Sequence, residues 1–127
     1  MLAKDIMRKK LVTVRPVDTI DKALKVMVEK DINGTPVVDD EGNLKGMIVK
    51  ADIYRFLIDP GHYESCPVEW VMTKDVVTAK KEENIYTIAK RLRQNDIIAI
   101  PVVGEEDAVV GIITIDDIID YFLENTK

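Results

Sequence analysis

Two patterns of hydrophobic and polar residues follow one another along this chain, and both occur twice. Short β-branched runs at Leu11–Val14 and Val76–Ala79 are typical of strands. After each run, apolar residues recur every three or four positions, which predicts one amphipathic helix in each half. Asp18 suits the N-cap of the first helix, and Asn84 that of the second, with Glu83 as the alternative.

A β-hairpin is predicted after each of these helices. In the first half, the runs Thr35–Val38 and Leu44–Val49 flank an acidic segment rich in turn-forming residues. A further helix from about Ala51 to Leu57 follows and stops before Pro60. A short leading helix containing Met7 or Met72 precedes each half.

The two halves are copies of one unit. A shift of 65 residues aligns positions 5–57 with 70–122 without a gap, and 16 of these 53 pairs are identical. We therefore expect an α/β (α+β) fold of tandem β-α-β-β-α repeats, at 1–58 and 67–127, joined by a linker at 59–66. A unit of about 60 residues buries little surface alone, so the halves should pack across a pseudo-twofold axis.

Composition narrows the class of protein. The 127 residues are 46% hydrophobic and 32% charged, with a net charge of −5 and one cysteine. That charge does not favour nucleic-acid binding, and apolar runs stay well below the roughly 18 residues of a membrane span. We expect a cytoplasmic protein without a disulfide framework or a Cys-based metal site. Phosphate-loop, dinucleotide, zinc-protease and Cys-x-x-Cys motifs are absent, so the sequence predicts no enzyme.

The repeats resemble a known family. The segments Asn33–Val38 and Gly46–Ile53, within such a tandem, are similar to the CBS domain, named after cystathionine β-synthase. The resemblance implies a CBS-domain pair, or Bateman module: a regulatory unit for AMP, ADP, ATP or S-adenosylmethionine that commonly dimerises. The resemblance implies that such a module needs no further cofactor and that its partners are a second copy of the chain, in a homodimer, and an effector protein.

The family's ligand motif is Gly, two apolar residues, Ser or Thr, two residues, then Asp. The second repeat matches it from Gly111 to Asp117, whereas Val49 replaces the hydroxyl residue in the first. At a helix N-terminus, Thr114 can donate to a phosphate, and Asp117 can accept both hydroxyls of a ribose. An ordinary helix cap explains the same residues without a ligand.

The resemblance also implies that both repeats contribute to each of two clefts. The stronger cleft would comprise Thr114, Asp117, Asp116, Val14, Arg15, Ile32, Asn33 and Gly34. The weaker cleft would comprise Asp52, Val49, Ala79, Lys80, Ile97, Ile98 and Ala99. Apolar members could sandwich an adenine, and Arg15 or Lys80 could neutralise a phosphate.

Simpler interpretations of these residues stay open. Arg15 and Lys80 also suit solvated loop charges. Adjacent helical residues point about 100° apart, so Asp116 and Asp117 are not expected to act together on a metal or a substrate. His62 and Cys66 lie in the linker without a third orienting group, so no nucleophile is expected there.

Two hypotheses for the function follow. The first is a non-catalytic sensor that binds an adenosyl compound between its repeats and signals to a partner chain. The alternative is a structural module with vestigial clefts that dimerises through apolar residues of its terminal helices, such as Phe56, Tyr121 and Phe122.

Overall fold

A computed structural model describes residues 1–125 of the chain, which form two compact units. One unit is Val12–Val76, and the other combines Met1–Leu11 with the described residues from Val77 to Asn125. The leading segment of each repeat therefore folds with the hairpin and helices of the opposite repeat. The compact units thus cut across the predicted repeats of 1–58 and 67–127.

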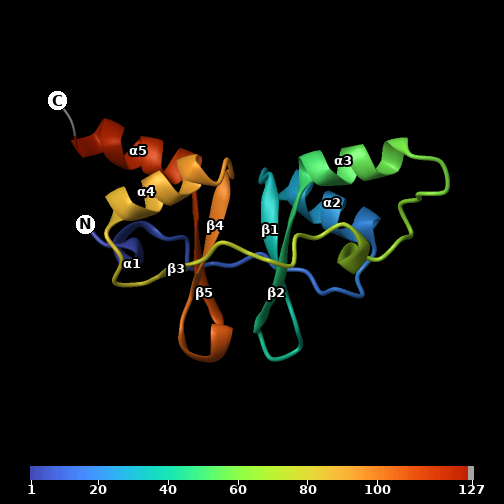
Figure 1. Ribbon diagram of the computed structural model, residues 1–127, viewed down its shortest axis with the longest axis horizontal. Helices are drawn as coiled ribbons and strands as arrows, with labels where there is room; N and C mark the ends of the chain where they lie inside the picture. The colour runs from blue at the N-terminus through green and yellow to red at the C-terminus, as the bar shows by residue number, and fades with distance from the viewer. Residues whose placement is uncertain (126–127) are drawn as a thin grey trace. The chain divides into compact units, whose positions relative to one another are not determined.

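The unit Val12–Val76 is built on an antiparallel hairpin of β1 (Gly34–Val38) and β2 (Leu44–Val49). Helices α2 (Ile20–Glu29) and α3 (Lys50–Ile58) lie together on one side of the strands (Figure 1). A 3₁₀ turn at Val68–Trp70 follows. The core of this unit consists of Val14, Ile20, Ala23, Met27, Val37, Ile48, Ile53, Cys66 and Val68.

The second unit repeats this plan with a three-stranded sheet. The short strand β3 (Ala79–Lys80) runs parallel to β4 (Ala99–Val103), which pairs antiparallel with β5 (Val109–Thr114). The helices of this unit are α1 (Ala3–Ile6), α4 (Ile85–Gln94) and α5 (Ile115–Asn125), with a 3₁₀ turn at Glu105–Asp107. Its core consists of Ala3, Ala79, Ile85, Ile88, Leu92, Ile100, Val102, Ile113 and Ile118.

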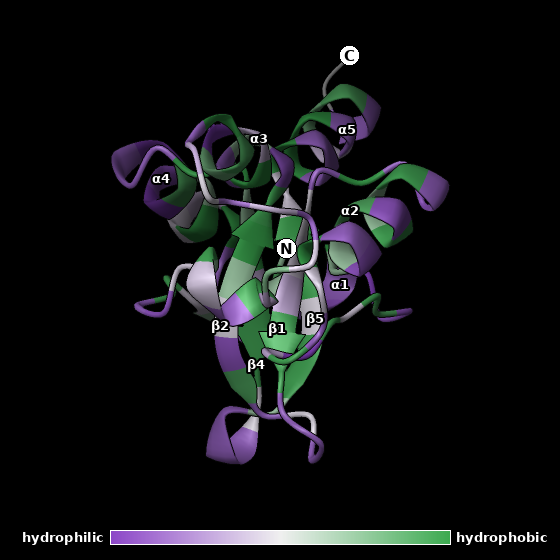
Figure 2. Cartoon of the chain, turned by 90° about the vertical axis from the view of Figure 1, so that its right-hand side faces the viewer, coloured by the Kyte–Doolittle hydropathy of each residue, from purple (hydrophilic) through white to green (hydrophobic). Residues whose placement is uncertain are grey.

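The predicted α+β fold is confirmed in each unit, including both hairpins and the helix expected at Ala51–Leu57. Hydrophobic residues run along the strands, whereas the helices carry both hydrophilic and hydrophobic faces (Figure 2). This distribution is expected when amphipathic helices cover a sheet of β-branched residues.

The first strand of each predicted repeat is wrong in extent. Of Leu11–Val14, only Val14 forms a bridge, parallel to Val37, and only Ala79–Lys80 pairs in the second unit. In the first unit, the Thr35 hydroxyl donates to the carbonyl oxygen of Val12. The Thr35 side chain thus takes the Val12 carbonyl oxygen, which a longer strand would have paired with a backbone amide, and the strand pairing stays short.

One predicted helix cap is also corrected. Thr19, not Asp18, caps α2, because its side chain accepts a hydrogen bond from the Lys22 amide at 3.2 Å. Asn84 caps α4 as predicted, through the Tyr86 amide at 2.8 Å. The predicted leading helices end before their methionines, since α1 stops at Ile6 and the 3₁₀ turn at Trp70.

The segment that precedes each repeat packs against its unit through a methionine that contacts a glycine. A Cβ atom added to Gly111 would lie 2.6 Å from the sulfur of Met7, and one added to Gly46 would lie 2.7 Å from the sulfur of Met72. Both approaches are far closer than van der Waals contact. This packing therefore requires a glycine at both positions.

This packing predicts the effect of adding one methyl group. Gly111→Ala should lower the free energy of unfolding by about 1–3 kcal/mol, because the methyl group overpacks the contact with Met7. Urea denaturation of Gly111→Ala, Met7→Ala and the double variant measures the coupling. In the Met7→Ala background the cost of Gly111→Ala should largely disappear; an equal cost in both backgrounds would contradict this account.

Candidate functional site

The predicted motif residues Thr114 and Asp117 meet where β5 passes into α5. The Thr114 amide donates to Asp117 Oδ2 at 2.9 Å, and the Asp117 amide donates to Thr114 Oγ1 at 3.1 Å. This reciprocal pair is a capping box, which satisfies two backbone donors at the start of the helix. The helix-cap interpretation of the motif is therefore confirmed, and a ligand at this junction would meet groups that already cap the helix.

Arg8 joins this cluster, and the sequence did not reveal it. Its Nε donates to Asp117 Oδ1 at 3.0 Å; the Asp117 side chain is 11% exposed and that of Arg8 is 52% exposed. The Arg8 backbone is bridged to Ile112 of β5 in both directions, at 2.9 and 3.1 Å. Arg8 belongs to the leading segment, 109 residues before Asp117, and no local motif marks it.

The start of β4 lies beside the same junction. Ala99 pairs with Thr114, and the Ile115 amide donates to the Ile98 carbonyl oxygen at 2.9 Å. Ile98 is exposed, whereas Ile97 packs against the core of this unit. The structure thus brings Ile98 and Ala99, predicted for the weaker cleft, next to Thr114.

The corresponding junction in the other unit lacks a side-chain cap. Val49 caps α3 without a side-chain hydrogen bond, as its apolar side chain requires. Gly34 pairs with Val49, and the Lys50 amide donates to the Asn33 carbonyl oxygen at 2.9 Å. Asp52 forms an ion pair with Arg55 of its own helix.

Each unit thus contains a different set of candidate residues from the one that was predicted to line each cleft. Thr114, Asp116, Asp117, Ala79, Lys80 and Ile97–Ala99 lie in one unit, and Val14, Arg15, Ile32–Gly34, Val49 and Asp52 lie in the other. The predicted grouping of each cleft takes residues from both units, and it stays a prediction.

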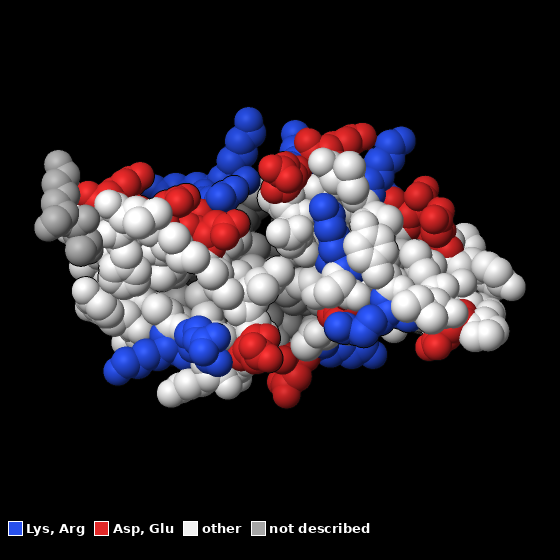
Figure 3. Space-filling view, turned by 90° about the horizontal axis from the view of Figure 1, so that it is seen from above, with Lys and Arg blue, Asp and Glu red and all other residues white. Residues whose placement is uncertain are grey.

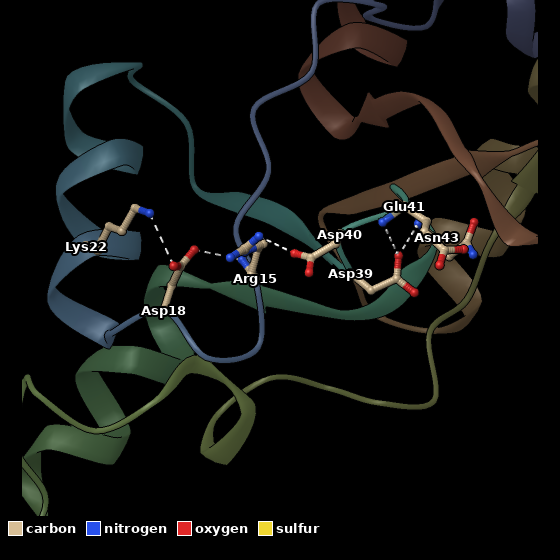
Figure 4. Close-up of polar contacts among 7 residues, drawn as sticks. All are labelled: Arg15, Asp18, Lys22, Asp39, Asp40, Glu41 and Asn43. Atoms are coloured by element: carbon tan, nitrogen blue, oxygen red, sulfur yellow. Dashed lines mark hydrogen bonds and ion pairs between the residues drawn. The ribbon is translucent and has the colours of Figure 1, made fainter.

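Arg15 is held at both its backbone and its side chain (Figure 4). Its amide donates to Asp18 Oδ2 at 2.8 Å, and its guanidinium pairs with Asp40 in the β1–β2 turn. Lys22 approaches the other oxygen of Asp18 at 3.2 Å. Partial burial favours the neutral form of Asp18, but the hydrogen bonds from Arg15 and Lys22 outweigh it, so the pKa of Asp18 lies below its ordinary value.

The turn that supplies Asp40 is itself ordered by a carboxylate. Asp39 Oδ1 accepts hydrogen bonds from the amides of Asn43 and Glu41, at 3.0 and 2.9 Å, and these bonds lower the pKa of Asp39 (Figure 4). Lys45 lies 3.8 Å from its other oxygen. Arg15 thus pairs with a turn of defined shape.

The same carboxylate position recurs in the second unit. Glu83 Oε1 accepts from the Lys80 amide at 2.8 Å, as Asp18 does from Arg15. Arg91 donates to both Glu83 oxygens, at 3.0 and 2.6 Å, and to the Thr78 carbonyl oxygen at 2.8 Å. The hydrogen bond from Arg91 lowers the pKa of Glu83 and raises that of Arg91. In both units, the residue predicted to neutralise a phosphate therefore has its amide held by a carboxylate three positions later.

The other candidate residues, Asp116, His62 and Cys66, each have different surroundings. Asp116 is exposed beside Asp117. The ring of His62 stacks on Phe56, with centroids 3.9 Å apart, and its Nδ1 lies 2.7 Å from the Phe56 carbonyl oxygen, while Cys66 is buried in the core. In the described part of the chain, no group of three or more His, Cys, Asp or Glu side chains could hold a metal ion.

The described surface carries both signs of charge. Lys and Arg side chains lie among Asp and Glu side chains over the face in Figure 3. Within residues 1–125, no helix combines the length and apolar character needed to cross a membrane. The helix residues predicted to mediate dimerisation, Phe56, Tyr121 and Phe122, instead pack half-buried against the core of their own unit.

Comparison with known proteins gives consistent matches. A family model described as "CBS domain" matches residues 3–59 and 68–124. Homoserine O-acetyltransferase of Methanococcoides burtonii is 38% identical over 114 residues, which are 90% of this chain but 22% of that protein. The chain therefore spans less than a quarter of the length of such relatives.

Two solved structures match nearly the whole chain. The CBS domain pair of protein MJ0100, in complex with 5′-methylthioadenosine and S-adenosyl-L-methionine, has a TM-score of 0.91 at 32% identity and covers 99% of this chain and 98% of that one. CBSX2 in complex with AMP has a TM-score of 0.88 at 27% identity, with the same coverage.

The Glu83–Arg91 pair predicts how stability depends on pH. Because the folded pKa of Glu83 lies below its ordinary value of 4.5, the pair stabilises the fold fully above that value and loses its effect as the pH falls through the folded pKa. Urea unfolding at pH 7 and pH 3 should therefore show a smaller loss of stability for Glu83→Gln than for the parent. Glu82→Gln, at the exposed neighbouring position, is the control and should behave like the parent.

Proposed function

Because the chain belongs to the CBS-domain family, we propose that it is a non-catalytic regulatory module that binds an adenosyl compound and passes this signal to a partner chain. One observation carries the proposal: the second repeat holds the complete ligand motif at an ordered strand–helix junction, and similar structures hold 5′-methylthioadenosine, S-adenosyl-L-methionine or AMP. No further cofactor is needed.

The chemistry of the Thr114 junction suits a nucleoside. The Thr114 hydroxyl accepts from the Asp117 amide, and its own hydrogen is left to donate to a phosphate or sugar oxygen. Asp117 Oδ1 and Oδ2 each accept one hydrogen bond within the unit, although a carboxylate offers about four acceptor positions. A ribose diol could therefore donate to Asp117 while the helix cap remains. Exposed Ile98, beside Thr114, offers an apolar surface to a base.

The junction at Val49 should bind more weakly. Val49 has no hydroxyl to donate, and Asp52 is paired with Arg55. Arg15 and Lys80 remain the proposed phosphate-neutralising residues, and Arg15 would have to leave Asp40 to act.

We also propose that the module acts on an effector protein. The matched region is a small part of larger enzymes, such as the acetyltransferase of Methanococcoides burtonii, which suggests that modules of this kind act on attached or associated catalytic domains. A ligand signals only if it binds two arrangements of the module with different affinity.

Calorimetry with AMP, ATP and S-adenosylmethionine tests the sensor. We expect at least one to bind below millimolar concentration, and Asp117→Asn to weaken it roughly 10- to 100-fold, because charge-assisted hydrogen bonds to the diol are lost. The control Asp120→Asn removes an exposed carboxylate from the same helix and should leave binding unchanged. If none of the three binds the folded parent, this proposal fails.

A homodimer is also proposed, and exposed apolar side chains support it. Tyr54 and Ile58 on α3 are 52% and 79% exposed, and Ile119 and Leu123 on α5 are 49% and 72% exposed. Such side chains on amphipathic helices favour self-association. We expect these four residues at the interface in place of Phe56, Tyr121 and Phe122. A purely structural role, in which the protein only dimerises, remains the alternative function.

Sedimentation equilibrium tests this assembly. The parent should sediment as a dimer at micromolar concentration, and Ile58→Lys or Leu123→Lys should shift it toward monomer by placing a charge in the interface. Val17→Lys, at an exposed apolar position outside the helices, should leave the dimer intact. A monomeric parent would refute the proposed dimer.

A further inference from the structure

The carboxylate proposed to bind the ribose is occupied within the chain itself. Asp117 Oδ2 accepts from the Thr114 amide, and Oδ1 accepts from Arg8 Nε at 3.0 Å. Only 11% of the Asp117 side chain is exposed. A diol approaching Asp117 therefore meets a guanidinium hydrogen bond at one oxygen and the helix cap at the other.

These two bonds differ in what breaking them would require. The Thr114 bond belongs to the capping box, so removing it would leave a backbone donor unsatisfied at the start of α5. The Arg8 bond is made by a half-exposed side chain, whose guanidinium water can solvate when the pair separates, while the hydroxyls of a ligand would take its place on the carboxylate. The Arg8 bond is the one that a ligand can displace.

The backbone of Arg8 would stay in place during this exchange. Its amide donates to the Ile112 carbonyl oxygen, and the Ile112 amide donates back, so the residue is bridged to β5 independently of its side chain. The neighbouring Met7 is packed against Gly111. Only a change of the Arg8 side-chain conformation is needed to free Asp117 Oδ1.

We propose that Arg8 competes with the ligand for Asp117. The hydroxyls of a bound ribose displace the Arg8 side chain, and the Arg8–Asp117 pair thereby sets the affinity of the site for ligands with a vicinal diol. This inference rests on the proposed adenosyl-binding function. It assigns Arg8 a role as an affinity-determining residue that the ligand motif does not include. The second repeat carries Thr73 at the position equivalent to Arg8, and this residue bridges to Met47 in the other unit. The device is therefore confined to the junction with the complete motif.

Adenosine is the appropriate probe, because it carries the diol but no phosphate that could itself attract Arg8. Calorimetry on the full chain should show that Arg8→Gln binds adenosine about two- to fivefold more tightly than the parent, which corresponds to the removal of one half-exposed ion pair. Lys9→Gln changes the net charge equally at the exposed neighbouring residue and should leave the affinity unchanged. For 2′-deoxyadenosine, which lacks one hydroxyl, the gain from Arg8→Gln should be smaller.

A spectroscopic measurement separates displacement from a general effect on the fold. In the parent, the ¹H–¹⁵N signal of Arg8 Nε–H should move toward that of a solvated arginine as adenosine saturates the site, while the Arg8 amide signal stays protected by its bond to Ile112. An Nε–H signal that remains protected at saturation would overturn the proposal. So would weaker or unchanged adenosine binding by Arg8→Gln.

The outcomes also distinguish this inference from the function on which it rests. If the parent binds AMP but neither it nor Arg8→Gln binds adenosine, the sensor stands and the competitor role of Arg8 is refuted. If neither protein binds AMP or adenosine, the proposed function fails and the inference fails with it. Adenosine binding by Arg8→Gln but not by the parent would support both.

Discussion

The contact between a methionine and a glycine positions the other parts of each unit. Met7 packs where Gly111 lacks a side chain, and Met72 packs in the same way on Gly46. Through these contacts the leading segment of one repeat becomes part of the unit that holds the other repeat's hairpin. A protein interior is packed closely enough that one added methyl group would disturb this arrangement. The glycine of the ligand motif is thus explained by packing before any ligand is considered.

That packing has a direct consequence for the proposed binding site. Because Met7 lies on Gly111, the next residue, Arg8, bridges to Ile112 and reaches Asp117 five positions further along the chain. The Asp117 carboxylate therefore has two partners, a helix cap and a cation. The cap and a bound ribose are compatible, since the capping bond takes only one acceptor position of the carboxylate and the half-exposed Arg8 side chain can be displaced.

Much of the fold could be predicted because its signals are local. The helix at Ile85–Gln94 and its Asn84 cap depend on residues close together in the chain. The hairpin at Gly34–Val49 depends on two runs of strand-forming residues and the turn-forming residues between them. The first strands were overestimated because β-branched residues indicate strand propensity, whereas the number of pairs depends on what lies beside them. Asp18 was assigned to the wrong role because an Asp before a helix suits both a cap and a turn, and Thr19 competes for the first of these.

By itself, the sequence determined the duplication, the main helices and hairpins, the family and the complete motif at Gly111–Asp117, because all of these depend on residues that are close in the chain or repeated at a fixed distance. Only the tertiary structure decided which leading segment packs on which hairpin. The ion pair between Arg8 and Asp117 follows from that choice, and it joins residues 109 positions apart. Periodicity and capping do not act over such a distance, so the pairing depends on the path of the chain and on the packing that holds it.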